Sequence, residues 1–243
     1  MSWSGDGKTL AVASGGEVIL VTDDLKGIQK VFKPEKSVLG VTWNPGGTQF
    51  ATVSGFRDPT FTLWDWDGGD QLVLAREIES DTDQYGVSWS PSGKLLATLA
   101  GDSKSVVQLW DASTWEEIQT FDLPYEKPRR ALQWSTDNST VYGAGELNGE
   151  AVFFGMDVKD GTVNELGKFI PSQAEVFAIS PAGDRFAVAD PRGVVQIIDV
   201  VSGDVLAEIK SVNQPVDMAW NPSGMTLAIL DYKTALQLWA VSK

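Results

Sequence analysis

Residues 85–111, YGVSWSPSGKLLATLAGDSKSVVQLWD, contain three apolar runs separated by two turns. The first run ends at Trp89 and is followed by Ser-Pro-Ser-Gly, in which Ser caps the backbone, Pro fixes φ and Gly supplies a positive φ. The second run spans residues 95–100, and the third closes on Trp110-Asp111. Apolar residues recur two positions apart before Trp89, which is the period of a strand with one apolar face. The stretch therefore predicts three antiparallel strands.

The same unit recurs along the whole chain. Its first turn begins at residues 3, 43, 89, 134, 179 and 220, so the spacings are 40, 46, 45, 45 and 41 residues. A period between 20 and 50 residues indicates a repeat architecture. A fourth, more polar strand is expected in five units, at residues 28–32, 72–78, 117–121, 163–169 and 205–209. We predict one nearly all-β domain over residues 1–243, with units at about 1–35, 36–80, 81–125, 126–172, 173–211 and 212–243.

A four-stranded unit of this length that closes on Trp-Asp resembles the WD40 repeat of β-propellers. Trp64-Asp65 and Trp110-Asp111 match the dipeptide, Ile198-Asp199 is a conservative variant, and the other three units depart from it. The family's Gly-His pair is missing, so its network of Asp, His, Ser or Thr and Trp cannot form in the usual shape. Aspartates stand at the expected place before the third strand: Asp58, Asp102, Asp190 and Asp231. The resemblance implies an all-β propeller of six blades that acts as an interaction scaffold.

The sixth unit has no sequence for an outer strand, because the chain stops just after the third strand. An open edge is therefore expected along Leu236, Gln237, Leu238 and Trp239, where backbone donors and acceptors lack a partner. Three alternatives stay open at this point. The chain forms a six-bladed ring with one three-stranded blade, it is a fragment of a larger propeller, or a partner strand or a second copy completes the ring.

Composition excludes several classes of function. The net charge of −14 opposes binding to nucleic acid and to anionic membranes, because affinity for both comes mainly from basic side chains. The chain has neither His nor Cys, which removes the usual general base, the commonest zinc ligands and thiolate chemistry. No apolar run approaches the roughly 18 residues of a membrane span. The first residues lack the features of a secretory signal, so we expect a cytoplasmic protein.

No motif for catalysis or metal binding stands out. Residues 65–70 and 81–86 are superficially similar to calcium loops, but the second has Tyr85 and Ser92 where an EF-hand loop needs ligands. The glycine-rich tracts do not follow a strand and open a helix, so they are not phosphate loops. We therefore expect no catalytic residue, no cofactor and no metal site.

Loop residues are the candidates for binding a partner. In the resembled fold, the outer-to-inner connections and the second-to-third turns share one face of the disc. Arg and Tyr are residue types that anchor interfaces, although loops are polar in general. The partner is expected to be a protein or peptide, and contact with an acidic peptide is the specific prediction. The candidate residues on this face are Phe56, Arg57, Tyr85, Tyr125, Arg129, Arg130, Arg192 and Tyr232.

The tryptophans divide into two groups. Four recur at one position of the unit and are predicted to be core: Trp43, Trp89, Trp134 and Trp220. Trp66 and Trp115 follow the third strand and are predicted to be exposed on the opposite face. Two other functions stay open for such a propeller. One is a propeller attached to a hydrolase or peptidase, which would need carboxylates on the inner strands, where Glu175 and Asp217 are the candidates. The other is a truncated or recombined propeller that oligomerisation completes.

Overall fold

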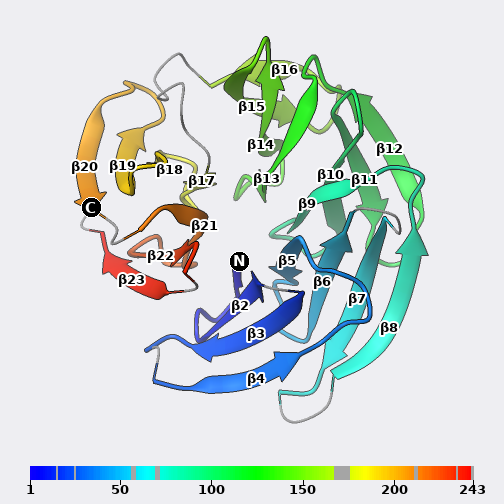
Figure 1. The fold of residues 1–243 in the computed structure, drawn as a ribbon. Coiled ribbons are helices and arrows are strands. Elements are labelled where there is room, and N and C mark those ends of the chain that lie inside the picture. The colour runs from blue at the N-terminus through cyan, green and yellow to red at the C-terminus, as the bar shows by residue number, and fades with distance from the viewer. Residues whose placement is uncertain are drawn as a thin grey trace.

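The sheets form a closed ring of six blades (Figure 1). The computed structural model describes residues 1–14, 16–24, 26–55, 59–68, 72–166, 176–210, 213–233 and 235–241, apart from the side chain of Arg130. Within these ranges every regular element is a strand. Five sheets have four strands in sequence order, and the last has three. The prediction of an all-β propeller of six blades with an incomplete last blade is confirmed.

The strands of each blade are numbered here from the channel outward. Blade 1 holds β1 (Ser2–Trp3), β2 (Thr9–Ser14), β3 (Glu17–Thr22) and β4 (Ile28–Phe32). Blade 2 holds β5 (Gly40–Trp43), β6 (Gln49–Ser54), β7 (Thr60–Trp66) and β8 (Leu72–Glu79). Blade 3 holds β9 (Gln84–Trp89), β10 (Leu95–Ala100), β11 (Val106–Asp111) and β12 (Glu117–Asp122).

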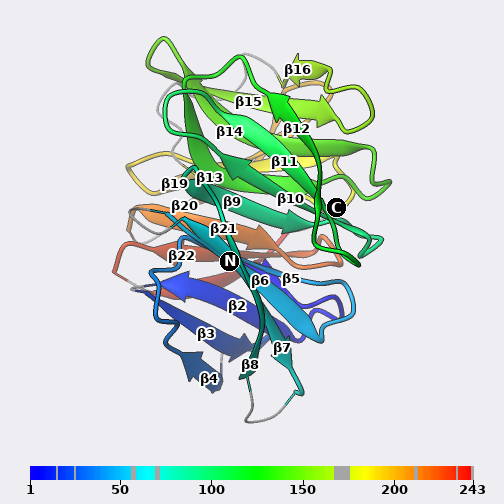
Figure 2. The same ribbon diagram turned by 90° about the vertical axis from the view of Figure 1, so that its right-hand side faces the viewer.

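The other three blades follow the same order around the ring. Blade 4 holds β13 (Lys127–Trp134), β14 (Thr140–Leu147), β15 (Glu150–Asp157) and β16 (Val163–Glu165). Blade 5 holds β17 (Val176–Ile179), β18 (Arg185–Ala189), β19 (Val194–Asp199) and β20 (Val205–Lys210). Blade 6 holds β21 (Pro215–Trp220), β22 (Thr226–Asp231) and β23 (Leu236–Ala240). Figure 2 shows the ring edge-on, with the strands running between its two faces.

One turn chemistry joins the inner strand to the second strand in all six blades. The carbonyl of the leading Ser or Asn accepts the N–H three residues later at 2.8–3.2 Å, and that later residue has φ between 62° and 71°. The leading side-chain oxygen accepts the N–H five residues later at 2.9–3.1 Å. Asn138 supplies the positive φ in blade 4, where the other blades use Gly. This shared chemistry explains why the turn identified the repeat.

The four repeated tryptophans are core residues, as predicted. Trp43, Trp89, Trp134 and Trp220 are 4%, 7%, 4% and 6% exposed. The prediction for Trp66 and Trp115 is wrong, because both are half-buried. The ring of Trp66 packs 5.2 Å from that of Trp43, and the ring of Trp115 packs 5.4 Å from that of Trp89. The backbone of Trp115 has a positive φ of 62°, and its side chain packs against the core cluster between blades 2 and 3.

Part of the expected tryptophan network does form without histidine. The indole Nε1 of Trp64 donates to Thr52 Oγ1 at 2.9 Å, and that of Trp110 donates to Thr98 Oγ1 at 3.2 Å. Each of these bonds joins the third strand of a blade to its second strand. The indole and hydroxyl pair therefore survives in the two blades that carry the Trp-Asp dipeptide.

Each of the six seams between blades holds at least one hydrogen bond near the channel. In three seams an inner-strand side chain accepts the backbone N–H of the next blade: Ser2 to Trp43 at 3.1 Å, Thr42 to Trp89 at 3.3 Å and Gln133 to Ile179 at 3.2 Å. In the other three, an indole donates to a backbone carbonyl: Trp134 to Ser88 at 3.0 Å, Trp220 to Ala178 at 3.3 Å and Trp3 to Ala219 at 3.3 Å. The last of these bonds closes the ring between blades 6 and 1.

Candidate interaction face and central channel

One face of the disc carries both the outer-to-inner connections and the second-to-third turns, and we call it the connection face. Backbone hydrogen bonds tie the two sets of loops together, because Leu39 N–H donates to Val53, Gly101 N–H to Asp83 and Tyr232 N–H to Gln214 at 2.8–3.1 Å. The other face, the turn face, carries the inner-to-second and third-to-outer turns. The loops of the connection face are therefore braced against one another, which suits a surface that keeps its shape.

Two buried aspartates hold second-to-third turns of the connection face. Asp231 is 1% exposed and accepts hydrogen bonds from the N–H groups of Lys233 and Ala235, both at 2.9 Å, and from Asn213 Nδ2 at 2.6 Å. Asp190 is 8% exposed and accepts the N–H groups of Val194 and Arg192. Burial opposes ionisation of both, but these hydrogen bonds hold each pKa below its ordinary value.

The other two aspartates of this set behave differently. Asp102 is exposed, and its carboxylate accepts a long hydrogen bond, at 3.5 Å, from the N–H of Asp83. Asp58 lies outside the described residues. The anchoring role expected for this position is thus present in blades 5 and 6 and much weaker in blade 3.

The mouth of the channel on the connection face carries a small charged group from blade 4. Lys127 Nζ lies 3.1 Å from Glu146, and Arg129 lies 3.6 Å from the same carboxylate. The Arg129 side chain is 30% exposed. Tyr85, on the neighbouring β9, is half-buried and lines the same cavity. Two cations thus share one carboxylate beside a tyrosine.

Farther around the same face, two predicted residues are exposed. Arg192 has 80% of its side chain exposed and lies 2.7 Å from Asp190. Tyr232 is 58% exposed, with the Lys233 ammonium 5.6 Å from its ring centre. Of the remaining candidates, Phe56, Arg57 and the side chain of Arg130 lie outside the described residues.

Tyr125 does not belong to this surface, which corrects the sequence-based expectation. It is 2% exposed and stacks on Phe154 with ring centres 5.2 Å apart. Burial, together with the charge of Glu165, raises the pKa of its hydroxyl to about 12. Gly145 makes room for it, since a Cβ at that position would lie 2.6 Å from the Cβ of Tyr125. Its ring therefore fills the core beside blade 4.

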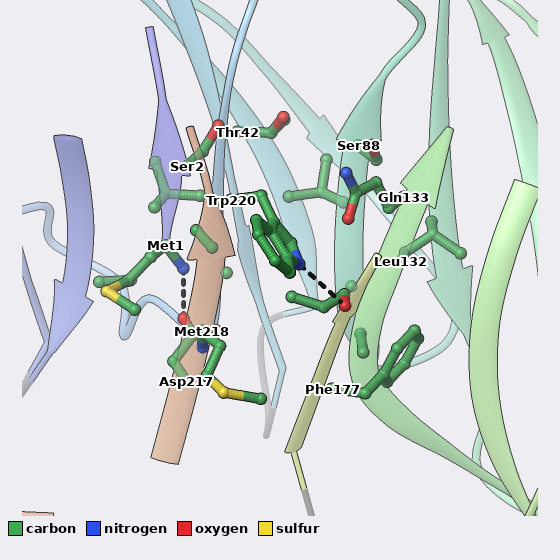
Figure 3. Close-up of a pocket in the computed structure, with 18 of the residues that line it drawn as sticks. Met1, Ser2, Thr42, Ser88, Leu132, Gln133, Phe177, Asp217, Met218 and Trp220 are labelled. Atoms are coloured by element: carbon green, nitrogen blue, oxygen red, sulfur yellow. Dashed lines mark hydrogen bonds and ion pairs between the residues drawn. The ribbon is translucent and has the colours of Figure 1, made fainter. Parts of the chain in front are cut away.

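The channel is a cavity of about 1010 Å³ lined by the inner strands of all six blades. Figure 3 shows Ser2, Thr42, Ser88 and Gln133 on its wall. The seams use three of these polar side chains as hydrogen-bond acceptors: Ser2, Thr42 and Gln133. Sequence reasoning missed this role. The available signal was a polar residue directly before the aromatic or apolar residue that ends the inner strand.

An ion pair at the wall of the channel occupies the predicted carboxylate. Asp217 pairs with the amino group of Met1, as Figure 3 shows, and also accepts the N–H of Met218 at 2.8 Å. Glu175, the other predicted inner-strand carboxylate, lies outside the described residues. Across the described part of the chain, no three carboxylates come close enough to hold a metal ion. The same part contains no helix with the length and apolar character to cross a membrane.

The edge of blade 6 has the geometry that the sequence predicted. Among the described strands, β23 pairs only with β22. Leu236, Gln237, Leu238 and Trp239 are all half-buried, and the Trp239 indole donates to Gln237 Oε1 at 3.1 Å. The outward side of this strand is open in the described structure.

The family of the chain follows from its sequence. Residues 15–123 and, in an overlapping second alignment, residues 74–192 match the family described as eukaryotic translation initiation factor eIF2A. Together they cover residues 15–192, well over half of the 243 residues. The chain belongs to the eIF2A family. The eIF2A match ends before β19, so blade 6 with its open edge lies beyond it. No curated protein sequence matches the chain significantly.

Solved structures share the fold of this eIF2A-family chain. The β-propeller domain of Cps50 (Swd1) from Myceliophteria thermophila has a TM-score of 0.70 and 17% identity, covering 99% of this chain and 82% of that one. Hydrazine synthase from Kuenenia stuttgartiensis has a TM-score of 0.74 and 16% identity, with the same coverages. At these identities the likeness concerns the architecture alone. Since one of the two is an enzyme by its name, the architecture does not decide between binding and catalysis.

Proposed function

We propose that this chain is a non-catalytic interaction propeller that binds a protein partner of the translation initiation machinery through its connection face. The family description supports the process. The braced loops support the mode of binding, since a rigid ring of loops gives a partner a surface whose ordering costs little on association.

The charged group at the channel mouth is the observation that carries this proposal. Within the described part of the chain, Lys127 and Arg129 both pair with one carboxylate, that of Glu146. A carboxylate from a partner would therefore complete the balance of charge. Arg192 and Tyr232 add a guanidinium and an aromatic ring on the same face, and residues of these types contribute strongly to interfaces. The partner segment is accordingly acidic.

The aspartates of the turn face favour this choice of side. Asp6, Asp24, Asp111, Asp137 and Asp199 lie in turns on that face, and hydrogen bonds from neighbouring groups lower the pKa of each. They therefore stay ionised at neutral pH and repel an acidic partner. An acidic segment is therefore expected to bind the connection face and not the turn face.

The test is capture of initiation proteins from a translation extract on the immobilised chain, compared between matched variants. The double variant Arg129→Ala/Tyr232→Ala removes two side chains of the connection face. Val201→Ala is the control, because Val201 lies on the turn face and is 91% exposed. We expect the double variant to lose the captured proteins at least tenfold and the control to keep them. Equal retention by both variants, or equal loss, would refute the proposal.

A further inference from the structure

The open edge of β23 differs in charge from the outermost strand of every other blade. Such edges are normally blunted by charged side chains, because a free ladder pairs with other chains. β4 contains Lys30, β8 contains Arg76, β12 contains Glu117, β16 contains Glu165 and β20 contains Glu208. The five residues of β23, Leu-Gln-Leu-Trp-Ala, include no charge. Among the described edges, this one is left open to pairing.

Two leucines of β23 are more exposed than their counterparts in other blades. The register places Leu238 opposite Ala228, as it places Leu20 opposite Ala11 and Ile197 opposite Ala187. Leu20 and Ile197 are 0% and 1% exposed, whereas Leu238 is half-buried.

The same comparison holds for Leu236. Its counterparts Val18, Phe61, Val107 and Val195 are all 0% exposed, whereas Leu236 is half-buried. The described strands include no outer strand in blade 6, whereas in the other blades side chains of that strand cover these positions.

The complete blades show what such a strand supplies. In four blades a large apolar residue of the outer strand lies opposite the counterpart of Leu236: Phe32 opposite Val18, Ile78 opposite Phe61, Phe121 opposite Val107 and Ile209 opposite Val195. Each of these residues packs into the core cluster of its seam. The described residues of blade 6 include no such residue, and Leu236, Leu238 and Ile19 are only partly buried at its seam with blade 1.

The backbone of β23 presents its free groups at these two leucines. The N–H of Val241 donates to Met225 and the carbonyl of Ala235 accepts from Asp231, so the backbone groups of these two residues, which flank β23, face β22. Because alternate residues of a strand direct their N–H and C=O groups to opposite sides, Leu236 and Leu238 direct theirs outward. A ladder of donors and acceptors is thus available where the apolar gap lies.

We propose that the edge of β23 binds an extended segment of a partner protein, antiparallel to β23, with a Phe or Ile opposite Leu236. A second copy of this chain fits less well. Two five-residue edges bury far less than the roughly 1,200 Å² of a stable interface, and each copy carries a net charge of −14. A peptide strand meets neither obstacle. This site is separate from the connection face and does not depend on the function proposed above.

The probe is a fluorescein-labelled peptide with the sequence of the chain's own outer strand β12, Glu-Ile-Gln-Thr-Phe-Asp, and the readout is fluorescence anisotropy with the whole chain. We expect saturable binding. Methylating those backbone nitrogens of the peptide that face β23 should weaken binding at least tenfold. The methylated peptide keeps its side chains but loses the N–H donors that would pair with β23. Replacing the Phe by Ser should do the same. Binding that survives methylation would overturn the proposal.

Two protein variants locate the site. Leu238→Lys should weaken peptide binding at least tenfold, whereas Ile118→Lys, at a 52% exposed position of β12, should not. The Arg129→Ala/Tyr232→Ala variant should bind the peptide like the wild type, which separates this test from that of the connection face. Sedimentation velocity should show a monomer. A dimer that Leu238→Lys dissociates would instead assign the edge to a second copy and refute the proposal.

Discussion

The indole Nε1 of Trp3 donates a hydrogen bond to the carbonyl oxygen of Ala219 at 3.3 Å, which joins residues 216 positions apart in the chain. With this bond the first blade meets the last. The adjoining cluster packs Trp3, Leu10 and Val12 against Ala219, Ala228 and Leu230. Side chains from the two ends of the chain therefore close the ring.

The variant Trp3→Phe should destabilise the protein by about 1 kcal/mol more than Trp89→Phe, as measured by urea unfolding. Both indoles are buried, at 8% and 7% exposure, so the loss of volume is similar. Trp89 Nε1 finds no hydrogen-bond partner among the described residues, whereas Trp3 Nε1 bonds to Ala219. Equal losses in the two variants would show that the closing bond contributes nothing.

Asn138→Ala should destabilise the turn of blade 4 more than Asn138→Gly does. It holds a φ of 62°, and its side chain accepts the N–H of Ser92 from the neighbouring blade at 2.8 Å. Asn138→Gly keeps the left-handed backbone but loses that bond, at a cost of about 0.5 kcal/mol or more. Asn138→Ala adds about 1 kcal/mol of backbone strain. Thermal unfolding should therefore rank the wild type first, the glycine variant second and the alanine variant last.

Acid should weaken the turn of blade 4. The side chain of Ser135, followed by the N–H and the hydroxyl of Ser139, lowers the pKa of Asp137 from 3.8 to about 2. Because the folded pKa lies below the unfolded one, this contribution to stability is complete above the unfolded value and is lost as the pH falls from about 4 to about 2. Carbon-detected NMR should give a midpoint near 2 for Asp137. A midpoint near 4 would contradict the assigned hydrogen bonds.

Gly145→Ala should destabilise the protein by about 1–3 kcal/mol through overpacking. The added Cβ would lie 2.6 Å from the Cβ of buried Tyr125, which cannot move away without disturbing its stack on Phe154. Gly27→Ala is the control, because its nearest neighbour would be a side-chain oxygen at 3.9 Å. Chemical denaturation of the two variants gives the comparison, and equal stability would contradict the packing argument.

The fold could be predicted from sequence because a local rule repeats. The turn that begins at Ser90 needs only a capping side chain, a proline and a residue with positive φ within five positions, and all six copies obey a version of it. Burial of the tryptophan before the turn follows from the same periodicity. These features depend on residues that are close together in the sequence, so one sequence is enough to predict them.

Contacts between blades could not be predicted in this way. Tyr125 stands in a polar loop, and only the glycine at position 145, in the next blade, makes a buried place for it. Trp115 lies beyond its strand and reaches the core through a left-handed backbone. The seam roles of Thr42 and Gln133 likewise depend on residues about 46 positions away. Such pairings are set by how blades stack, which the pattern within one unit does not specify.

The described strands pair only within their own blade. The continuous chain crosses five seams, whereas the described residues at the seam between blades 6 and 1 are joined by packed side chains, the bond from Trp3 to Ala219 and the pair of Met1 with Asp217. Separating these two blades would open the closed ring at one point and would leave every described β-ladder intact. The ring can therefore open at this seam without the loss of a β-ladder and without stretching a connection between blades.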